Sequence, residues 1–209
     1  PLQANSDSYG FAFGGLGSNT SGVLAYNQNW TYNVAYAEDG KRKEGISFFD
    51  GSARSRQEIT ILNSDQNAIV GETMYDFEGR PAVSMLPTPV PSTGIGMYEN
   101  AIVGAPFNKG YTKTNYDRDA NFIIPNGPDP MNLLGMSSAT NDYYSSTTPS
   151  TSLYAAYIPD ALLFPFSRTA YKSDGTDRII EQTGVGPFLK QGTNNTTKYY
   201  YGTPADMEI

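Results

Sequence analysis

The sequence predicts an all-β protein, and composition, turn chemistry and residue alternation each support that fold class. Aromatic residues make up 13% of the 209 residues, with 16 Tyr and 10 Phe, whereas charged residues make up only 17%. Aromatic side chains favour strands, and the 21 Gly and 14 Pro supply many turns. Asp-Gly and similar turn signals separate short segments in which apolar and polar residues alternate. We therefore expect an antiparallel β-hairpin meander with long irregular loops.

The chain divides into four stretches of different composition. Residues 1–28 are rich in Gly, Ser and Asn and predict an irregular lead-in. Residues 29–86 carry dense strand signals and predict five or six antiparallel strands with short connections. Residues 87–150 begin with the Pro-rich "PTPVPSTG" and predict a loop-rich insertion. Residues 151–209 add further strands, expected in "TSLYAAYI", "FPFSRTAYK", "RIIEQTG" and "KYYYGT".

Alternation is clearest in "NWTYNVAYAE", at the start of the second stretch. Trp30, Tyr32, Val34 and Tyr36 fall on one face of an extended chain, because successive side chains of a strand point to opposite faces. The Asp-Gly pair at 39–40 is a strong hairpin signal, and "EGISFFD" provides the returning strand. The stretch therefore begins with an antiparallel hairpin.

Charge and missing residue types exclude several classes of function. The net charge is −7 and the longest basic run is "KRK", so phosphate contacts cannot support nucleic-acid binding. The absence of His and Cys excludes Ser-His-Asp and Cys-His catalysis, disulfides and the usual zinc sites. No apolar run approaches 18 residues, so no membrane span is expected. We expect no metal, no cofactor and no catalytic residue.

One turn motif has a physical role for each of its residues. Tyr75 ends a strand and offers a large half-buried face. Asp76 can accept hydrogen bonds from backbone N–H groups two residues further along, which closes a turn. Gly79 supplies a positive φ before the chain re-enters the sheet. Arg80 can lay its stem over an aromatic ring and pair its guanidinium with a carboxylate. None of these roles requires a substrate.

A second copy of the motif lies upstream in "FFDGSAR". Phe49, Asp50 and Arg54 stand where the downstream copy has Tyr, Asp and Arg. Ala53 stands where the downstream copy has Gly, so this turn is expected to differ in detail. Repeat architectures reuse one unit because a single unit cannot bury its own face. The repetition therefore predicts stacked hairpins that extend one sheet.

Tyr-Asp-x-x-Gly-Arg is the core of the YD repeat, and the chain resembles the RHS-repeat proteins, in particular the RHS-like secreted or surface proteins of Bacteroidetes. Five phrases carry this resemblance over about residues 29–209: "YAEDGKRKEGISFFDGSARSRQ", "YDFEGRPAVSMLP", "YIPDALLFPFSRTAY", "DRIIEQTGVGP" and "KYYYGTP". The resemblance implies a β-sheet that coils into a hollow shell around a toxic C-terminal domain.

The resemblance also implies a location and partners. Such proteins are large and secreted or held at the bacterial cell surface, with export by the type IX route in Bacteroidetes. The partners would be the remainder of the same polypeptide, its encapsulated C-terminal domain and the secretion machinery. The chain begins at Pro1 and stops at Ile209, which resembles two cuts through a longer protein. We therefore expect a non-catalytic structural segment of a shell.

Two alternatives to a structural segment stay open. Tyr143 and Tyr144 in "DYYS" could stack sugars, which would make the chain a glycan- or protein-binding β module. Ordinary strand packing of these aromatic side chains is the simpler interpretation. A glycosidase would need two carboxylates facing each other across a substrate, and one sequence cannot place them. The enzyme is the weakest of the three hypotheses.

Overall fold

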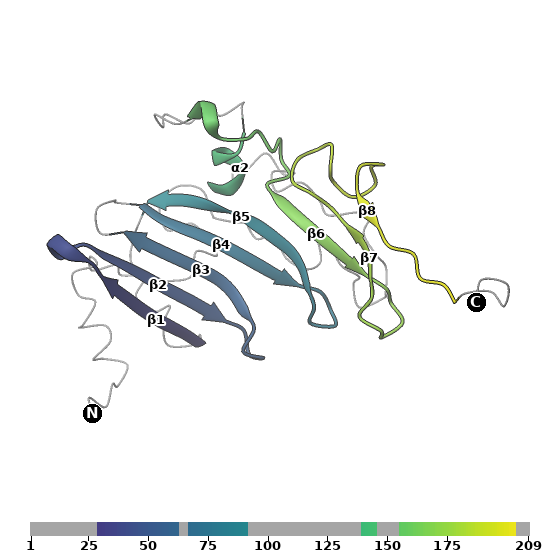
Figure 1. The fold of residues 1–209 in the computed structure, drawn as a ribbon, viewed down its shortest axis with the longest axis horizontal. Coiled ribbons are helices and arrows are strands. Elements are labelled where there is room, and N and C mark those ends of the chain that lie inside the picture. The colour runs from purple at the N-terminus through teal and green to yellow at the C-terminus, as the bar shows by residue number, and fades with distance from the viewer. Residues whose placement is uncertain (1–28, 63–66, 92–138, 146–154, 204–209) are drawn as a thin grey trace.

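The computed structural model describes residues 29–62, 67–91, 139–145 and 155–203, and within them the chain forms one antiparallel sheet. Its eight strands lie in the order of the sequence, from β1 to β8 (Figure 1). The described helices are short, and none is long and apolar enough to cross a membrane. The predicted all-β class and hairpin meander are confirmed. The expected lead-in at 1–28 and most of the expected insertion at 87–150 lie outside the described residues.

The strands and helices follow one another with short connections up to β5. The first part comprises β1 (Asn29–Tyr36), the 3-10 helix η2 (Glu38–Gly40), β2 (Arg42–Phe49), β3 (Ser55–Leu62), β4 (Asn67–Tyr75) and β5 (Pro81–Pro91). The second part comprises α2 (Ala139–Tyr143), the 3-10 helix η4 (Ala155–Tyr157), β6 (Phe166–Tyr171), β7 (Ile179–Gln182) and β8 (Thr197–Lys198). Helix α2 packs against β5.

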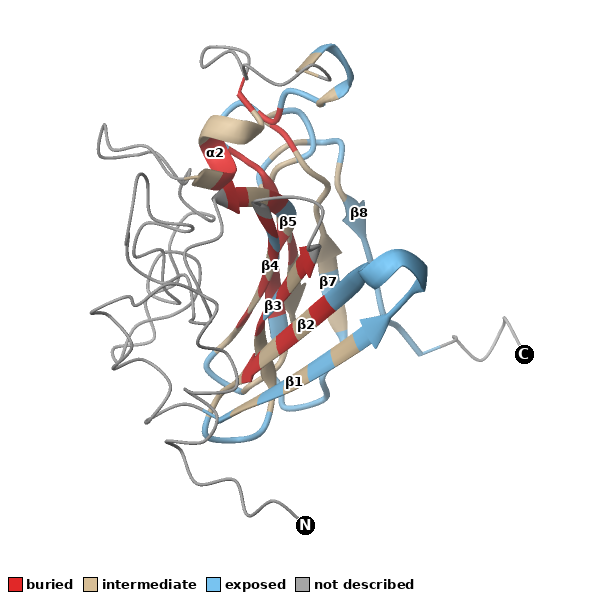
Figure 2. Ribbon diagram, turned by 90° about the vertical axis from the view of Figure 1, so that its left-hand side faces the viewer, coloured by how far each residue is buried: buried red, intermediate tan, exposed pale blue. Residues whose placement is uncertain are grey.

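One face of the sheet carries the core. The register places Tyr32, Ile46, Ile59 and Val70 opposite one another on β1–β4, so their side chains form one row across the strands. Buried residues concentrate on β2–β5, whereas β1 and β8 are mostly exposed (Figure 2). Each fully buried aliphatic side chain contributes about 1.5–3 kcal/mol to the stability of the sheet. The core comprises Ile46, Phe48, Ile59, Ile61, Ala68, Val70, Met74, Ala82, Val83, Met85, Val90, Phe164 and Phe166.

A buried carboxylate ties β1 to β2. The Tyr32 hydroxyl donates to Glu44 at 2.7 Å, and Arg42 Nε donates to the other carboxylate oxygen at 2.6 Å. Glu44 is only 3% exposed, and these two hydrogen bonds offset the cost of burying its polar side chain. Burial, together with the bond to Glu44, raises the pKa of Tyr32. The phenol therefore stays protonated and keeps donating.

Strand β5 is longer than the sequence indicated. The expected insertion was placed from residue 87 onward, but β5 continues to Pro91 and pairs with β4 along the way. Pro87, Pro89 and Pro91 recur at every second residue, so their missing N–H groups all face the same side of the strand. Strand β6 pairs only with residues 83–85 of β5. Among the described strands, the side of β5 away from β4 therefore has no ladder hydrogen bonds at these prolines. The strand therefore extends over residues 87–91, at the start of the stretch in which loops were expected.

Two other expected strands are shorter or different in kind. "TSLYAAYI" was expected to be a strand, but its described residues form the 3-10 helix η4 at 155–157. In "KYYYGT", regular pairing is limited to Thr197–Lys198, although the backbone N–H of Tyr199 still donates to the Ile180 carbonyl at 3.0 Å. Tyrosine density in a segment indicates β propensity but not the length of the ladder, because pairing also depends on the neighbouring strand.

Candidate functional site

The two predicted turns, 50–54 and 76–80, have the same hydrogen bonds. In each turn, the backbone N–H of the Asp donates to the Arg carbonyl, at 2.9 Å in both copies. Oδ1 of Asp50 accepts from the N–H groups of Ser52 and Arg54 at 2.8 and 3.0 Å. Oδ1 of Asp76 accepts the equivalent pair of N–H groups at 3.0 and 2.8 Å. Each Asp side chain therefore closes its own turn, as its chemistry indicates.

Ala53 leaves the hydrogen bonds of its turn the same as those of the downstream turn, and the two residues, Ala53 and Gly79, differ in φ. Ala53 adopts φ 59°, close to the left-handed conformation of Gly79 at φ 88°. The N–H of each residue donates to the Asp carbonyl at 3.0 Å. The expected difference in detail is therefore seen in φ and not in these hydrogen bonds. The closed turn imposes a positive φ on an alanine, at a cost of roughly 1–2 kcal/mol relative to a right-handed conformation.

A third hairpin has the same closing hydrogen bond as the two shorter turns, but its turn, 172–178, is longer. The N–H of Lys172 donates to the Arg178 carbonyl at 2.8 Å, as Asp does to Arg in the shorter turns. Asp177, directly before the arginine, again has a positive φ, of 55°. Asp174 closes the tip of this turn by accepting from the N–H of Thr176 at 3.1 Å. The three turns lie at one end of the sheet (Figure 1), and the Tyr201 ring lies against Arg178 of the third turn. We name these three turns and Tyr201 the turn edge.

The strand pairing also shifts register at the same place in each hairpin. Register shifts fall directly before the aromatic residue that ends the first strand: Phe49 in β2, Tyr75 in β4 and Tyr171 in β6. Each shift leaves one extra residue in the returning strand, which is the pattern of a β-bulge. Bulges increase the local twist, so the three hairpins curve the sheet at the same level along the turn edge.

The arginine of each hairpin contacts the tyrosine of the next. The guanidinium of Arg54 lies over the Tyr75 ring at 4.6 Å from the centroid, and that of Arg80 lies over Tyr171 at 4.5 Å. Arg178 lies over the Tyr201 ring at 5.3 Å. A cation over an aromatic face contributes about 0.5–1 kcal/mol at exposed sites and more where water is excluded. The contact therefore joins hairpins, whereas the Asp–Arg pair stabilises a single turn.

Each tyrosine hydroxyl then bonds back to the preceding hairpin. Tyr75 donates to the Ser55 carbonyl at 2.7 Å. Tyr171 donates to the Pro81 carbonyl at 2.9 Å, and the Tyr201 hydroxyl donates to the carbonyl of Ile179 at 2.9 Å. In all three cases the acceptor directly follows the stacked arginine. The turn edge thus repeats one two-part contact three times, with the ring under the arginine and the hydroxyl on the next carbonyl.

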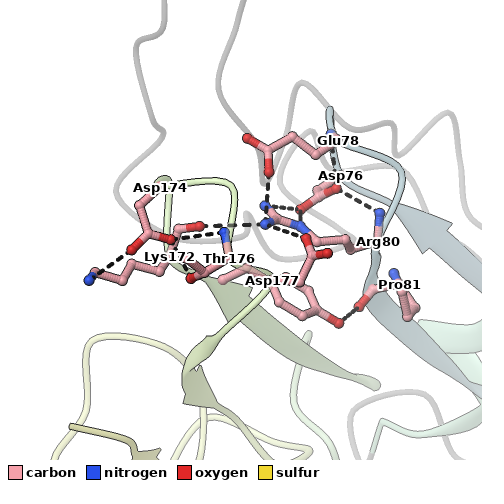
Figure 3. Close-up of polar contacts among 9 residues, drawn as sticks. Asp76, Glu78, Arg80, Pro81, Lys172, Asp174, Thr176 and Asp177 are labelled. Atoms are coloured by element: carbon pink, nitrogen blue, oxygen red, sulfur yellow. Dashed lines mark hydrogen bonds and ion pairs between the residues drawn. The ribbon is translucent and has the colours of Figure 1, made fainter. Parts of the chain in front are cut away.

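Arg80 is the most connected arginine of the turn edge. Its Nε and Nη2 bind Oδ2 of Asp76, both at 2.7 Å, and its Nη1 binds Glu78 at 2.8 Å. The same Nη1 reaches Asp177 of the third hairpin at 3.3 Å and the Lys172 carbonyl at 3.4 Å. Figure 3 shows this guanidinium between the carboxylates of its own turn and the Asp177 carboxylate of the neighbouring turn. Arg80 therefore holds together two hairpins that are about 90 residues apart in the sequence.

The electrostatics of the turn edge favour the paired, structural states of its groups. Burial alone would raise the pKa of Asp50, but the hydrogen bonds from Arg54 and from the N–H of Ser52 outweigh it and hold this pKa below its usual value. Burial raises the pKa of Tyr75 and of Tyr171, so both hydroxyls remain protonated donors. A carboxylate held ionised and a phenol held neutral are poorly suited to exchange protons with a substrate.

The structure brings the seven predicted turn residues together and places the two predicted contact tyrosines elsewhere. Phe49, Asp50, Arg54, Tyr75, Asp76, Gly79 and Arg80 all lie on the turn edge. Tyr143 and Tyr144 belong to α2 and the residue after it, and their rings form an edge-to-face pair at 4.9 Å. The Tyr144 hydroxyl donates to the Pro87 carbonyl, so this side chain fastens α2 to β5. A glycan contact at these tyrosines stays a prediction.

Sequence reasoning missed the third repeat of the turn edge. Tyr171, Arg178 and Tyr201 take part in the same repeated contacts, but the sequence motif did not identify them. The motif is hidden there because Lys172 replaces Asp and the turn is longer, so the spacing from tyrosine to arginine changes. A search for tyrosine, an Asp-Gly tip and an arginine at variable spacing would have found "YKSDGTDR". Within the described ranges, no group of three or more acidic side chains is placed to hold a metal ion.

Comparison with known proteins gives one family match. Residues 23–124 match the model of a family described as a domain of unknown function, DUF6443. The matched stretch includes strands β1–β5 and the turns 50–54 and 76–80, whereas the third hairpin lies beyond it. No curated protein matches the chain. The family description assigns no activity, so inferences about function depend on the geometry.

Proposed function

We propose that the chain is a non-catalytic structural segment of an RHS/YD-repeat β-shell in a large secreted toxin or surface protein of a bacterium. In this role it helps to enclose or present a cargo domain. The observation that carries the proposal is the repeated contact of the turn edge, in which each arginine lies over the next tyrosine. A contact that each hairpin makes with its successor allows a sheet to grow by adding hairpins, which is the logic of repeat architectures.

The state of the polar groups supports a structural role rather than catalysis. The carboxylate oxygens of Asp50 and Asp76 accept hydrogen bonds from turn N–H groups and from the arginine of the same turn. A glycosidase would instead need one carboxyl held protonated to act as general acid, across from a second carboxylate. The proposed partners are the remainder of the same polypeptide, its enclosed C-terminal domain and the secretion machinery.

The outer strands suggest where neighbouring segments attach. Strand β1 pairs only with β2, and β8 only with β7, so among the described strands each leaves one edge of its backbone without a ladder partner. Such edges are templates for further pairing unless a protein covers them. At the β8 side, Tyr200 is 88% exposed and Tyr201 is 49% exposed. In the proposed shell, preceding and following hairpins pair with these two edges.

A structure of the native polypeptide, isolated from its source, tests the proposal. We expect residues 29–36 and 197–201 each to pair with a further strand, and arginine–tyrosine contacts to continue beyond Tyr201. Solvent-exposed edges in the native polypeptide would contradict the proposal. Turnover of any substrate in a broad panel of chromogenic glycosides would contradict its non-catalytic part.

A further inference from the structure

The chain contains three Asp-Gly pairs, and all three lie in turns that the structure describes. They are Asp39-Gly40 in the β1–β2 hairpin, Asp50-Gly51 in the β2–β3 hairpin and Asp174-Gly175 in the β6–β7 hairpin. An aspartate followed by glycine can cyclise onto its own backbone, because glycine has no side chain that would hinder the attacking nitrogen. A Cβ added to any of these glycines would meet nothing within 4 Å. The glycines are therefore equally open, and differences among the pairs must come from the aspartates.

Two of the three carboxylates are held by hydrogen bonds at both oxygens. Oδ1 of Asp50 accepts from two backbone N–H groups of its turn, and Oδ2 accepts from Arg54 Nε at 2.7 Å. Oδ1 of Asp174 accepts from the N–H and hydroxyl groups of Thr176, and Oδ2 binds Lys172 Nζ at 2.8 Å. These bonds hold the pKa of Asp174 below its usual value, and at Asp50 they outweigh burial, which would raise the pKa. Both carboxylates are therefore kept ionised and fixed in place.

The carboxylate of Asp39 is not held in this way. Asp39 is exposed, and within the described part of the chain no hydrogen bond or ion pair engages its side chain. Asp39 and Gly40 both have a positive φ, of 60° and 70°, as in a two-residue hairpin turn of type I′. Two backbone bonds close this turn, from Ala37 N–H to the Lys41 carbonyl at 2.8 Å and from Lys41 N–H to the Glu38 carbonyl at 3.2 Å. The turn lies at the end of the sheet opposite the turn edge (Figure 1).

A free carboxyl group before glycine can undergo two successive reactions with balanced loss and gain of water. In the first, the backbone nitrogen of Gly40 attacks Cγ of the protonated Asp39 carboxyl. The N–Cγ bond forms, a C–O bond breaks, and the hydroxyl leaves as water with the amide proton, which gives a succinimide. In the second, water adds to either ring carbonyl and opens the ring to aspartate or isoaspartate. Ring closure needs a neutral carboxyl that can rotate, so the bonds at Asp50 and Asp174 oppose it.

We propose that Asp39-Gly40 is a site of spontaneous modification, at which Asp39 isomerises to isoaspartate while Asp50 and Asp174 are protected. Isoaspartate adds one CH₂ group to the backbone of the β1–β2 turn. A two-residue turn sets the register of its hairpin, so the added group disfavours the pairing of Tyr36 with Arg42 and loosens β1. Among the described strands β1 pairs only with β2, so no second partner holds it in place. The site is independent of the proposed shell, because it requires only one hairpin.

Incubation of the full chain in heavy-oxygen water at neutral pH, followed by digestion and mass spectrometry, tests the proposal. Each succinimide that opens takes up one heavy oxygen, which marks both products, and methylation by an isoaspartate-specific carboxyl methyltransferase identifies the isoaspartate. We expect Asp39 to be labelled at least about ten-fold faster than Asp50 or Asp174, because those two must first release a charge-assisted hydrogen bond. In concentrated urea these bonds are lost, and the three rates should converge.

One variant tests whether the hydrogen bonds are the cause of the protection. Arg54→Met removes the ion pair of Asp50 and should speed labelling at Asp50, whereas Asp174, in another hairpin, should keep its rate unless the whole chain unfolds. Gly40→Ala should slow labelling at Asp39 alone, because a methyl group then stands beside the attacking nitrogen.

Hydrogen exchange of the isomerised fraction measures the effect on the sheet. Amides of residues 30–36 should exchange faster than in the unmodified chain, and those of β4 should not change. No labelling at Asp39, equal labelling of all three aspartates in the folded chain, or a preference for Asp39 that persists in urea would each overturn the proposed site. Unchanged exchange in β1 would overturn the proposed loosening of that strand.

Discussion

Replacing Arg80 by Met should destabilise the protein more than the same change at Arg54. The two arginines occupy equivalent positions, but the side chain of Arg80 is 15% exposed and that of Arg54 is 35% exposed. Loss of the charge-assisted bonds to a nearly buried Asp76 costs about 1.5–3 kcal/mol. The contact with Asp177, which is 74% exposed, adds about 0.2–1 kcal/mol, and the stack on Tyr171 adds about 0.5–1 kcal/mol. The expected total is about 3 kcal/mol.

The equivalent total for Arg54 is smaller. Among the carboxylates that the structure describes, Arg54 binds only Asp50 of its own turn. It also stacks on Tyr75, at a more exposed position than Arg80. Screening by water reduces that pair, so Arg54→Met should cost about 1.5 kcal/mol. Urea unfolding followed by tyrosine fluorescence measures both free energies, and the midpoint of Arg80→Met should be the lower. Equal losses, or a larger loss for Arg54→Met, would refute the claim that contact between hairpins sets the stability of the turn edge.

Three further predictions concern single residues of the turn edge. Gly79→Ala should lower the free energy of unfolding by more than about 1 kcal/mol, because Gly79 has φ 88° and an added Cβ would overlap the Arg54 guanidinium. As a control in the same urea assay, Gly51→Ala should change the free energy of unfolding by no more than about 0.5 kcal/mol, because the space around Gly51 is open. The folded-state pKa of Asp50 is lowered, so its contribution is complete above about pH 4 and is lost as the pH falls through that pKa. Unfolding midpoints measured from about pH 7 to pH 2 should therefore decline less steeply in Asp50→Asn, and an unchanged slope would contradict this. Tyr171→Phe removes one hydroxyl–carbonyl bond and should cost about 1 kcal/mol, whereas no change in the thermal midpoint would show that the bond contributes nothing.

The strands of the first half could be predicted from the sequence because their information is local. Alternation in β1, the Asp-Gly signal after it and the Tyr-Asp-x-x-Gly-Arg turn each specify structure over a few residues. The roles of Asp76 and Gly79 followed from side-chain chemistry and the need for a positive φ. Ala53 shows the limit of this reasoning, because the hydrogen bonds of the closed turn impose a left-handed conformation on a residue that does not favour it.

The contacts between hairpins could not be predicted, because their partners are distant in the sequence. Arg80 stacks on Tyr171 across the whole expected insertion, and no local pattern connects the two positions. The prolines of β5 suggested a loop because proline usually ends a strand. Their spacing of two residues nevertheless allows β5 to pair with β4 up to Pro91, beyond a register shift between Val70 and Glu72. Both errors arise because tertiary context decided the outcome over local propensity.

A cavity of about 230 Å³, lined by residues of β5, β6 and β7 among others, illustrates a different limit. Arg168, Lys172 and Gln191 are unremarkable in the sequence, since single basic or amide residues are common on strands and loops. Only the pairing of β5 with β6, and the return of the loop after β7, bring these side chains around one space. Sites that depend on the packing of three segments become visible only once the fold is known.

The intact mass of the native polypeptide, taken from its source, tests the central claim most directly. If the chain is one segment of a β-shell, this mass should lie far above 22.7 kDa, and peptides flanking residues 1 and 209 should be found in the same molecule. A native mass near 22.7 kDa would contradict the shell, because no further hairpins would then exist to continue the turn edge.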